Sequence, residues 1–217
     1  MGRTTRSRRT PAEIADAIRD EILRGDLEPG TSARQDELAA RFAVSRVPVR
    51  EALRSLVAEG LVTWESQRGF RVAQLAPEEA REILEIRALL EVQALNWAFP
   101  NIGKDTVVAA QRALRRAQTT KSIDEWSELN GLFHATILSP CGRPQLLALI
   151  QQLNNRIDRY IRLLVSRGDY RLRAEREHRA ILAAIEVGNP SAAASLLQQH
   201  IADTGNWLDN FLAERRS

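Results

Sequence analysis

The feature that most constrains the fold of this chain is a local change in its hydrophobic repeat. In the first part of the chain apolar residues recur every three or four positions, as at Ile14, Ile18 and Ile22, which is typical of amphipathic helices. Over residues 61–73 the repeat becomes two, which is typical of strands. Beyond Pro77 the helical repeat returns and no further strand pattern follows. The sequence therefore predicts two structural units, of which only the first contains a sheet.

Clear start and stop signals divide the first unit into short elements. Thr10-Pro11-Ala12-Glu13 is a capping box with proline at the first helical position, and Gly25 ends that helix. Further helices are expected over about 35–42 and 46–59, the second capped by Ser45, and strands over 61–65 and 70–73 joined at 66–69. Three helices followed by a two-stranded hairpin predict a winged helix-turn-helix over residues 10–75.

The second unit is expected to be helical throughout, over residues 78–214. Helical segments run at about 78–98, 104–119, 123–139, 144–167, 170–187 and 190–213, and most of the breaks between them contain proline or glycine. Short connections favour antiparallel packing of neighbouring helices. The predicted fold class is therefore mainly α, with an N-terminal winged helix-turn-helix and a C-terminal antiparallel α-helical bundle.

Charge and cysteine content limit the possible partners and compartment. The net charge is only +3, but residues 1–9 carry four arginines and no acid, and are expected to form a flexible basic arm. A local concentration of positive charge indicates a polyanionic partner. The single cysteine, Cys141, excludes an intramolecular disulfide and fits the reducing cytoplasm. No apolar run is long enough to span a membrane, and the basic N-terminus lacks the apolar region of a secretory signal.

The helix that follows Ser45 carries arginines along one face. Arg46, Arg50 and Arg54 stand at i, i+4 and i+8, while the apolar residues of the same segment recur on another face. Arg46 falls in the first turn, where helix-turn-helix proteins reach base edges. An arginine that bonds O6 and N7 of guanine contributes roughly 1–3 kcal/mol of base discrimination.

Three further residues are candidates for contact with DNA. Arg34 lies at the start of the preceding helix, and Arg68 and Gly69 lie at the tip of the predicted wing. The alternative is that all these arginines form only a solvated face. The three helices and the wing expected around them favour contact with double-stranded DNA.

Three histidines, the only ones in the chain, predict a polar site inside the bundle. His178 and His200 each lie 11 residues from Asn189 in the Gly188-Asn189-Pro190 turn (189−178 and 200−189), so an antiparallel hairpin places them at the same height. His134 lies on a third helix, with Asn130 one turn earlier on the same face. All three rings share faces with apolar residues and are expected to point into the core.

The histidines can be interpreted in two ways. Taken singly, each is a core residue whose ring nitrogens are satisfied by neighbours, since an unsatisfied buried group costs on the order of 1–3 kcal/mol. Taken together, they predict a divalent metal site formed by Asn130, His134, His178 and His200. Three imidazole nitrogens and one amide oxygen suit Zn²⁺ first, and Ni²⁺ or Co²⁺ as alternatives.

Four stretches of the chain resemble a known family. LAARFAVSRVPVREALRSLVAEG at 38–60 and RGFRV in the wing are similar to the helix-turn-helix of the GntR family of bacterial transcription regulators. NGLFH at 130–134 and EHRAILAAIEVGNPSAAASLLQQH at 177–200 are similar to the FCD effector domain of its FadR subfamily. The resemblance implies a homodimer that binds a palindromic operator and a small ligand in the bundle that changes DNA affinity.

The chain departs from the family pattern at two positions. Ala43 stands where the family often has glycine, and a positive φ there would cost alanine around 1 kcal/mol. Asn130 stands where metal-binding members commonly have aspartate, so the metal would lose one compensating negative charge. A small organic acid could supply that charge at the open coordination positions. Arg87 is similar in place to a basic residue that lines family pockets, although it also stands four residues before Glu91 and can pair with it.

The leading interpretation is a ligand-responsive transcription regulator and not an enzyme. A constitutive DNA-binding repressor with purely structural histidines is one alternative. A metal-dependent hydrolase is the other. It is disfavoured because no carboxylate is evident as a general base, since Glu177 neighbours His178 but points about 100° away around the helix. Three of the four tryptophans, Trp97, Trp126 and Trp207, are expected in the core.

Overall fold

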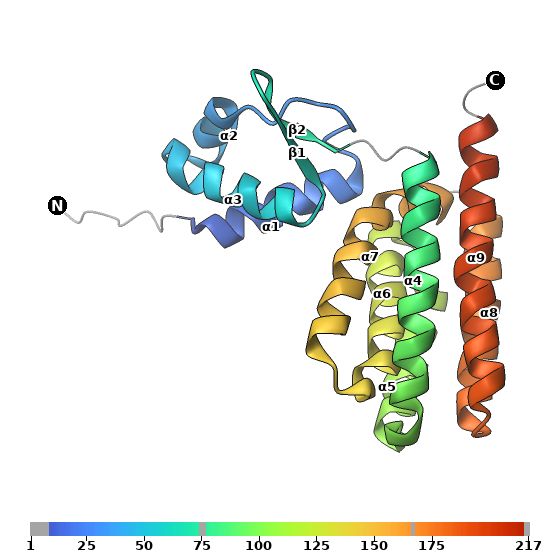
Figure 1. Cartoon of the computed structure of the whole chain (residues 1–217). Coiled ribbons are helices and arrows are strands. Elements are labelled where there is room, and N and C mark those ends of the chain that lie inside the picture. Colours follow the sequence, from blue (N-terminus) through green and yellow to red (C-terminus); the bar gives the residue numbers. More distant parts are fainter. Residues whose placement is uncertain (1–8, 74–76, 166–167, 215–217) are drawn as a thin grey trace. The chain divides into compact units, whose positions relative to one another are not determined.

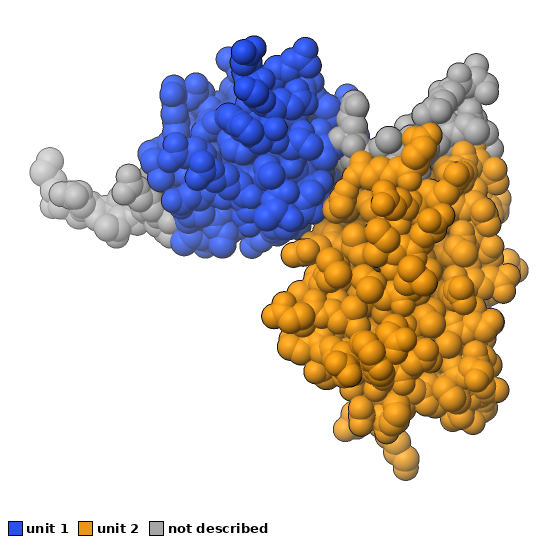
Figure 2. Space-filling model, in the orientation of Figure 1, with its two compact units in different colours: residues 1–74 blue, residues 75–217 orange. Residues whose placement is uncertain are grey.

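A computed structural model describes residues 9–73, 77–165 and 168–214 (Figure 1). The chain divides into two compact units, residues 1–74 and residues 75–217 (Figure 2). Of the expected basic arm, only Arg9 falls within the described residues.

The first unit is a winged helix-turn-helix, as the sequence predicts. Its elements are α1 (Pro11–Arg24), α2 (Gln35–Phe42), α3 (Arg46–Ala58), β1 (Val62–Glu65) and β2 (Gly69–Val72). The capping box forms as expected: Thr10 Oγ1 accepts from the backbone N–H of Glu13 at 3.2 Å, and the Glu13 carboxylate accepts from that of Thr10 at 2.7 Å. Gly25 ends the helix in the left-handed conformation at φ 83°. The apolar faces of α1, α2 and α3 bury one another and the inner face of the hairpin.

The turn between α2 and α3 contains a strained residue. Ala43 adopts φ 54° and ψ 43°, so the left-handed conformation that glycine favours is held here by alanine. The backbone accommodates it because the N–H of Val44 bonds the carbonyl of Ala39 at 3.0 Å. Ser45 occupies the N-cap position of α3, but its side chain makes no capping hydrogen bond, so the expected cap is wrong in that respect.

The wing is a hairpin with one addition that the sequence pattern does not reveal. Val62 pairs with Val72 and Glu65 with Gly69, which leaves a connection one residue shorter than expected. Residues 31–33 run along the outer edge of β2, with the N–H of Ala33 bonded to the carbonyl of Phe70 at 2.8 Å. This segment is too short to show an alternating pattern. It is extended because its backbone bonds to the strand beside it.

The second unit is a helical bundle made of α4 (Pro77–Ala98), α5 (Lys104–Thr119), α6 (Ile123–Leu138), α7 (Pro144–Val165), α8 (Gly168–Glu186) and α9 (Pro190–Glu214). Two short 3₁₀ turns, η1 (Phe99–Asn101) and η2 (Ser139–Cys141), follow α4 and α6. Figure 1 shows long helices side by side, and α4 packs against α9 and α7 while α8 packs against α9. Trp126 and Phe133 lie at the centre of the core. No helix in the described part of the chain is both long and apolar enough to cross a bilayer.

One expectation about the core is wrong. Trp97 is 40% exposed and lies under the Arg143 guanidinium, which stands 3.9 Å from the ring centroid. Trp126 is buried as expected, and Trp207 is half-buried. A tryptophan near the end of a helix can leave the core because a neighbouring cation covers its ring face.

Candidate metal centre and nucleic-acid interface

The structure brings the three histidines together in the core of the bundle. His134 comes from α6, His178 from α8 and His200 from α9, and their exposed fractions are 1%, 2% and 5%. One ring nitrogen from each lies within 4.8 Å of those of the other two. Nε2 of His178 stands 3.1 Å from Nε2 of His200. The rings of His178 and His134 are 5.2 Å apart, and Phe133 packs on His178 at 4.8 Å.

The turn between α8 and α9 sets the register of two of these rings. Gly188 takes the left-handed conformation at φ 71° after the last turn of α8. Asn189 Oδ1 then accepts from the N–H of Ala192 at 3.0 Å, which caps the start of α9. The helices leave this turn antiparallel, so residues equally distant from it face each other. The predicted alignment of His178 with His200 is therefore found.

A buried carboxylate from α4 holds the ring of His134. Glu91 is fully buried, and its Oε2 lies 2.9 Å from His134 Nδ1. Its other oxygen, Oε1, accepts from Nε and Nη2 of Arg87 at 2.9 and 2.8 Å. Arg87 thus forms the i, i+4 ion pair with Glu91 that the sequence spacing indicated. Only one edge of the guanidinium is used in this pair, and contact between Arg87 and an effector stays a prediction.

A second carboxylate, from α8, holds His200 in the same way. Oε2 of Glu177 lies 2.8 Å from His200 Nδ1, and its Oε1 accepts from Arg173 Nε at 2.6 Å. The sequence pattern did not reveal that carboxylates would contact the histidine rings. Glu177 does turn away from His178, its sequence neighbour, but this direction carries it to His200 on the adjacent helix.

The two carboxylates decide which nitrogens are free to bind an ion. Burial works to raise the pKa of Glu91, but the Arg87 charge and His134 outweigh it and lower this pKa from 4.5 to about 2. The pKa of Glu177 is also lowered: Arg173 and the bond to His200 outweigh the effect of burial. Ionised carboxylates only accept hydrogen bonds, so Nδ1 of His134 and Nδ1 of His200 each carry a hydrogen. Burial lowers the pKa of His200 below 6.5, so this ring is neutral at pH 7 and keeps a lone pair on Nε2.

His178 differs from the other two histidines. Burial is the main cause that lowers its pKa well below 6.5, and the neighbouring histidines add to it, so the ring is neutral at pH 7. Because His200 keeps its lone pair on Nε2, His178 donates from Nε2 in the 3.1 Å contact between them. The hydrogen of His178 thus stands on the nitrogen that faces the cluster.

The cluster has the chemistry of a nitrogen-rich metal site. Zn–N bonds of ~2.1 Å hold two ligating nitrogens roughly 3.0–3.5 Å apart, and the Nε2 atoms of His178 and His200 stand at 3.1 Å. Neutral imidazoles with carboxylates on their second nitrogens are typical ligands of Zn²⁺, Ni²⁺ and Co²⁺. Asn130 lies one turn before His134 on α6 and is half-buried. Its role as a fourth ligand stays a prediction.

The predicted DNA-binding residues lie on the surface of the first unit. Arg46, Arg50 and Arg54 are all exposed on α3. A polar hollow of about 240 Å³ collects Arg34, Arg46, Arg68 and Gly69. Acidic neighbours hold these arginines: Glu37 pairs with Arg34 at 2.7 Å, Asp36 with Arg46, and Glu65 with Arg68 at 3.7 Å.

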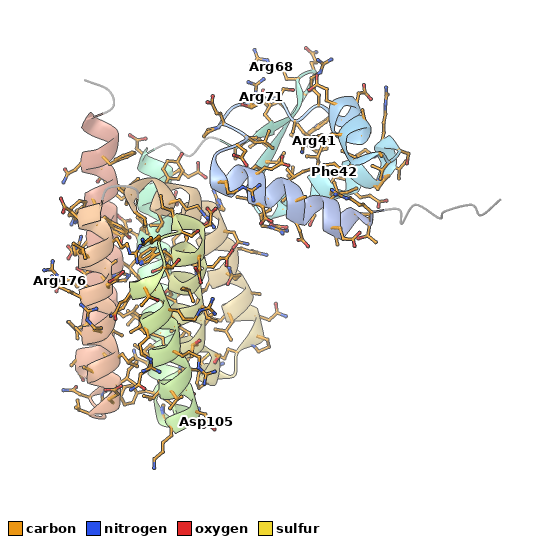
Figure 3. The ribbon with its side chains drawn as sticks, turned by 180° about the vertical axis from the view of Figure 1, so that it is seen from behind. Arg41, Phe42, Arg68, Arg71, Asp105 and Arg176 are labelled. Atoms are coloured by element: carbon orange, nitrogen blue, oxygen red, sulfur yellow. The ribbon has the colours of Figure 1, made fainter. Side chains whose placement is uncertain are left out.

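Residues that were not predicted to contact DNA also lie near this surface. Arg50 and Arg54 line a neighbouring hollow together with Trp64 of β1, which is exposed and whose ring centroid lies 4.7 Å from that of Phe70 on the paired strand. Figure 3 shows Arg68 and Arg71 at the hairpin, and Arg41 beside Phe42. Arg41 stands 4.8 Å from the centroid of the Phe42 ring and pairs with Glu21 at 2.8 Å, so it has structural partners within the unit.

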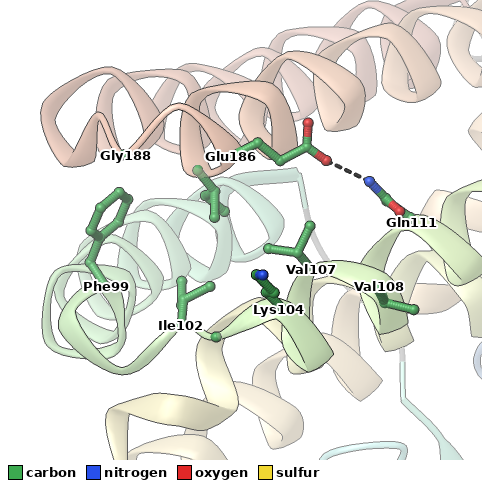
Figure 4. Close-up of a pocket in the computed structure, with 10 residues that line it drawn as sticks. Phe99, Ile102, Lys104, Val107, Val108, Gln111, Glu186 and Gly188 are labelled. Atoms are coloured by element: carbon green, nitrogen blue, oxygen red, sulfur yellow. Dashed lines mark hydrogen bonds between the residues drawn. The ribbon is translucent and has the colours of Figure 1, made fainter.

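Another hollow, of about 460 Å³, lies between η1, the start of α5 and the end of α8 (Figure 4). Its walls are mostly apolar, and Gln111 at its edge donates to Glu186 at 2.7 Å. None of the predicted site residues lines it.

Together these features define a class of protein. A winged helix-turn-helix with exposed arginines, followed in the chain by a helical unit that encloses a polar cluster, is the architecture of a DNA-binding regulator with a sensory domain. The model of the bacterial regulatory proteins, gntR family, matches residues 10–72, and that of the FCD domain matches residues 82–203. The chain belongs to the GntR family of bacterial transcription regulators and carries an FCD domain.

Individual relatives support this assignment. The chain is 30% identical over 195 residues to the HTH-type transcriptional repressor GlaR of Escherichia coli K12, spanning 85% of this chain and 89% of that one. It is 31% identical over 205 residues to a probable D-xylose utilization operon transcriptional repressor of Paenarthrobacter nicotinovorans, spanning 91% and 90%. The solved structure of E. coli McbR/YncC shares the fold, with a TM-score of 0.80 at 22% identity over 93% of this chain and 98% of that chain. Since the relatives are named regulators and both domains are regulatory, the chain is a transcription regulator and not an enzyme.

Proposed function

We propose that this regulator binds a palindromic DNA operator as a homodimer and that a small carboxylate effector, bound beside a divalent metal ion in the FCD domain, changes its affinity for that operator. The observation that carries the sensing half is the convergence of His134, His178 and His200, two of which have a carboxylate on Nδ1. A cluster built only to fill the core would not need three imidazoles whose nitrogens lie within 4.8 Å of one another.

The arginine-lined surface of the first unit supports the DNA-binding half. Arg46 stands at the first position of α3, from which a side chain reaches into the major groove. Arg34 and Arg68 flank it in the same hollow and are suited to the phosphates on either side. We assign base reading to Arg46 and Arg50, and phosphate or minor-groove contact to Arg34, Arg54, Arg68 and the backbone at Gly69.

The residues around the cluster support an anionic effector. A divalent ion held by His134, His178 and His200, with Asn130 as the fourth ligand, would supply positive charge and open coordination positions for a carboxylate. The second edge of the Arg87 guanidinium, which Glu91 does not use, can pair with the same anion. Tyr170 and Thr204 add buried hydroxyls nearby: Thr204 donates to the carbonyl of His200 at 2.9 Å, and Tyr170 donates to Thr204 Oγ1 at 3.3 Å.

The remaining alternative is a constitutive repressor in which the histidines are structural. In that case the bonds of Glu91 and Glu177 to the rings would serve only to satisfy buried nitrogens. A hydrolytic role is disfavoured further by the same contacts. Both oxygens of each carboxylate already accept hydrogen bonds, so neither is free to act as a general base.

One experiment separates sensing from constitutive repression. Full-length protein is purified without chelator, its metal content is measured by mass spectrometry, and its operator is selected from random DNA. Operator affinity is then measured with bound metal, after removal of the metal, and with metal plus a series of small carboxylic acids. We expect about one transition-metal ion per chain and a change of roughly 5- to 150-fold with one of the acids, the usual range of allosteric coupling. Protein that holds no metal and binds operator identically under all three conditions would be a constitutive repressor.

A further inference from the structure

Among the described residues of the helical unit, three ion pairs share one construction, in which an arginine is followed four residues later by a glutamate. They are Arg87–Glu91 on α4, and Arg171–Glu175 and Arg173–Glu177 on α8. In all three, Oε1 of the glutamate accepts from Nε of the arginine. The pairs differ in what else the glutamate holds. Glu91 and Glu177 each reach a histidine of the cluster through Oε2, whereas Glu175 accepts from Trp126 Nε1 at 3.2 Å through the same oxygen that holds its arginine.

The contacts with arginine orient the carboxylates of Glu91 and Glu177 independently of their contacts with the histidines. The guanidinium groups of Arg87 and Arg173 can only donate hydrogen bonds, so the glutamate atom that faces each of them must be an oxygen. The second oxygen is then directed at a ring Nδ1, at 2.9 Å for His134 and 2.8 Å for His200. An oxygen at that place accepts a hydrogen bond from Nδ1–H. The lone pair of a neutral ring is then on Nε2.

We propose that Glu91 and Glu177 are positioning residues that hold His134 and His200 as Nδ1–H tautomers, with the Nε2 lone pairs directed into the cluster where a metal ion binds. The inference rests on the proposed function, because it assigns a role in metal binding. Arg87 and Arg173 act through these glutamates, because each arginine determines which carboxylate oxygen faces the histidine ring. His178 has neither a carboxylate partner nor a fixed Nδ1 hydrogen, and it is the one histidine whose hydrogen must move from Nε2 when it becomes a ligand.

Replacement of the Glu91 or Glu177 carboxylate by an amide tests whether these residues determine the tautomers of His134 and His200. In Glu91→Gln the amide oxygen stays on Arg87, because the NH₂ group would meet the guanidinium donor to donor. The NH₂ group then faces His134 Nδ1, which must become an acceptor, and the hydrogen of the ring moves to Nε2. Glu177→Gln does the same to His200. Glu175→Gln is the matched control, since one amide oxygen can accept from both Arg171 and Trp126, and no histidine is involved.

The tautomers are measured directly by long-range proton–nitrogen correlation spectra of the full-length, metal-free protein. In the wild type we expect Nδ1–H signals from His134 and His200 and an Nε2–H signal from His178. Glu91→Gln is expected to convert His134 alone to the Nε2–H form, and Glu177→Gln to convert His200 alone. Glu175→Gln is expected to leave all three unchanged. The assignment is overturned if the tautomers of the two test variants match those of the wild type.

Metal affinity gives the second readout, by competition of Zn²⁺ between the protein and a chelator. Loss of such a partner of a ligating histidine typically weakens binding by about 10- to 100-fold, and we expect this for Glu91→Gln and Glu177→Gln but not for Glu175→Gln. The absorption spectrum of the Co²⁺-loaded protein reports changed ligand geometry independently of folding stability. Wild-type protein that binds metal, with unchanged affinity in both test variants, would overturn this inference alone. Wild-type protein that binds no metal would overturn the proposed function and this inference together, whatever the tautomers.

Discussion

At the scale of single residues, the same side chain often has two candidate roles that only its contacts separate. Arg41 and Arg46 both lie in a basic stretch of the sequence. Arg41 is engaged with Glu21 and the Phe42 ring, while Arg46 lines the hollow at the start of α3 and is held by Asp36. An exposed pair such as Arg46 with Asp36 contributes little to stability, so the arginine remains available to DNA.

The assignment of Arg46 and Arg50 to base reading predicts a selective loss. Arg46→Ala with Arg50→Ala is expected to weaken operator binding by at least about tenfold per arginine, since each guanine contact contributes roughly 1–3 kcal/mol. The measurement is a gel shift or fluorescence anisotropy titration on the selected operator at fixed salt. Arg112→Ala with Arg115→Ala, exposed on α5 in the other unit, removes the same charge and should have little effect. Unchanged affinity in the first double variant would refute the reading face.

At the scale of elements, helix ends in this chain are decided by short local signals. Gly25, Gly60, Gly142 and Gly188 each take a positive φ at or just after the end of a helix, and Ala43 does the same without the advantage of glycine. The α8–α9 turn has the largest consequence, because the Gly188 conformation and the Asn189 cap set the register that brings His178 to His200.

One chemical change at two glycines is expected to have opposite effects. Gly188→Ala forces alanine into φ 71°, while Gly131→Ala places alanine inside α6, and neither new methyl group meets another atom within 4 Å. The first is expected to cost about 1 kcal/mol and lower the melting temperature of the helical unit by roughly 2–4 °C, and the second to raise it by a similar or smaller amount. Thermal unfolding followed by circular dichroism tests both. Equal shifts of the same sign would show that backbone conformation is not the cause.

At the scale of the whole molecule, one face of α4 exposes several large apolar side chains. Ile86, Leu89 and Trp97 lie along α4 at spacings of three and eight residues (89−86 and 97−89) and are all exposed. Leu89, at 71% exposed, is the most open of the three. Large apolar side chains aligned on one face are typical of a surface that meets another protein. In the proposed homodimer the natural occupant is the same face of a second copy.

This placement of the dimer contact predicts how oligomeric state responds to a charge. Leu89→Glu would bring like charges together across a twofold axis and is expected to shift the dimer toward monomer by at least tenfold in dissociation constant. Leu172→Glu, at a residue 61% exposed on α8, is the control and should leave the mass unchanged. Sedimentation equilibrium gives both values. A Leu89→Glu protein that remains as dimeric as the wild type would place the interface on another face.

The sequence by itself determined the two units, the class and approximate bounds of nearly every helix and strand, the exposed arginine face of α3 and the convergence of three histidines. These depend on periodicity, caps and turn residues, which are local in the chain and can be read within a few residues. The tertiary structure alone decided that Glu91 and Glu177 hold His134 and His200, that residues 31–33 extend the wing, and that Trp97 lies outside the core. The reason is physical: each of these outcomes depends on a contact between segments far apart in sequence, and no local pattern specifies which distant side chain will face a given ring or strand edge.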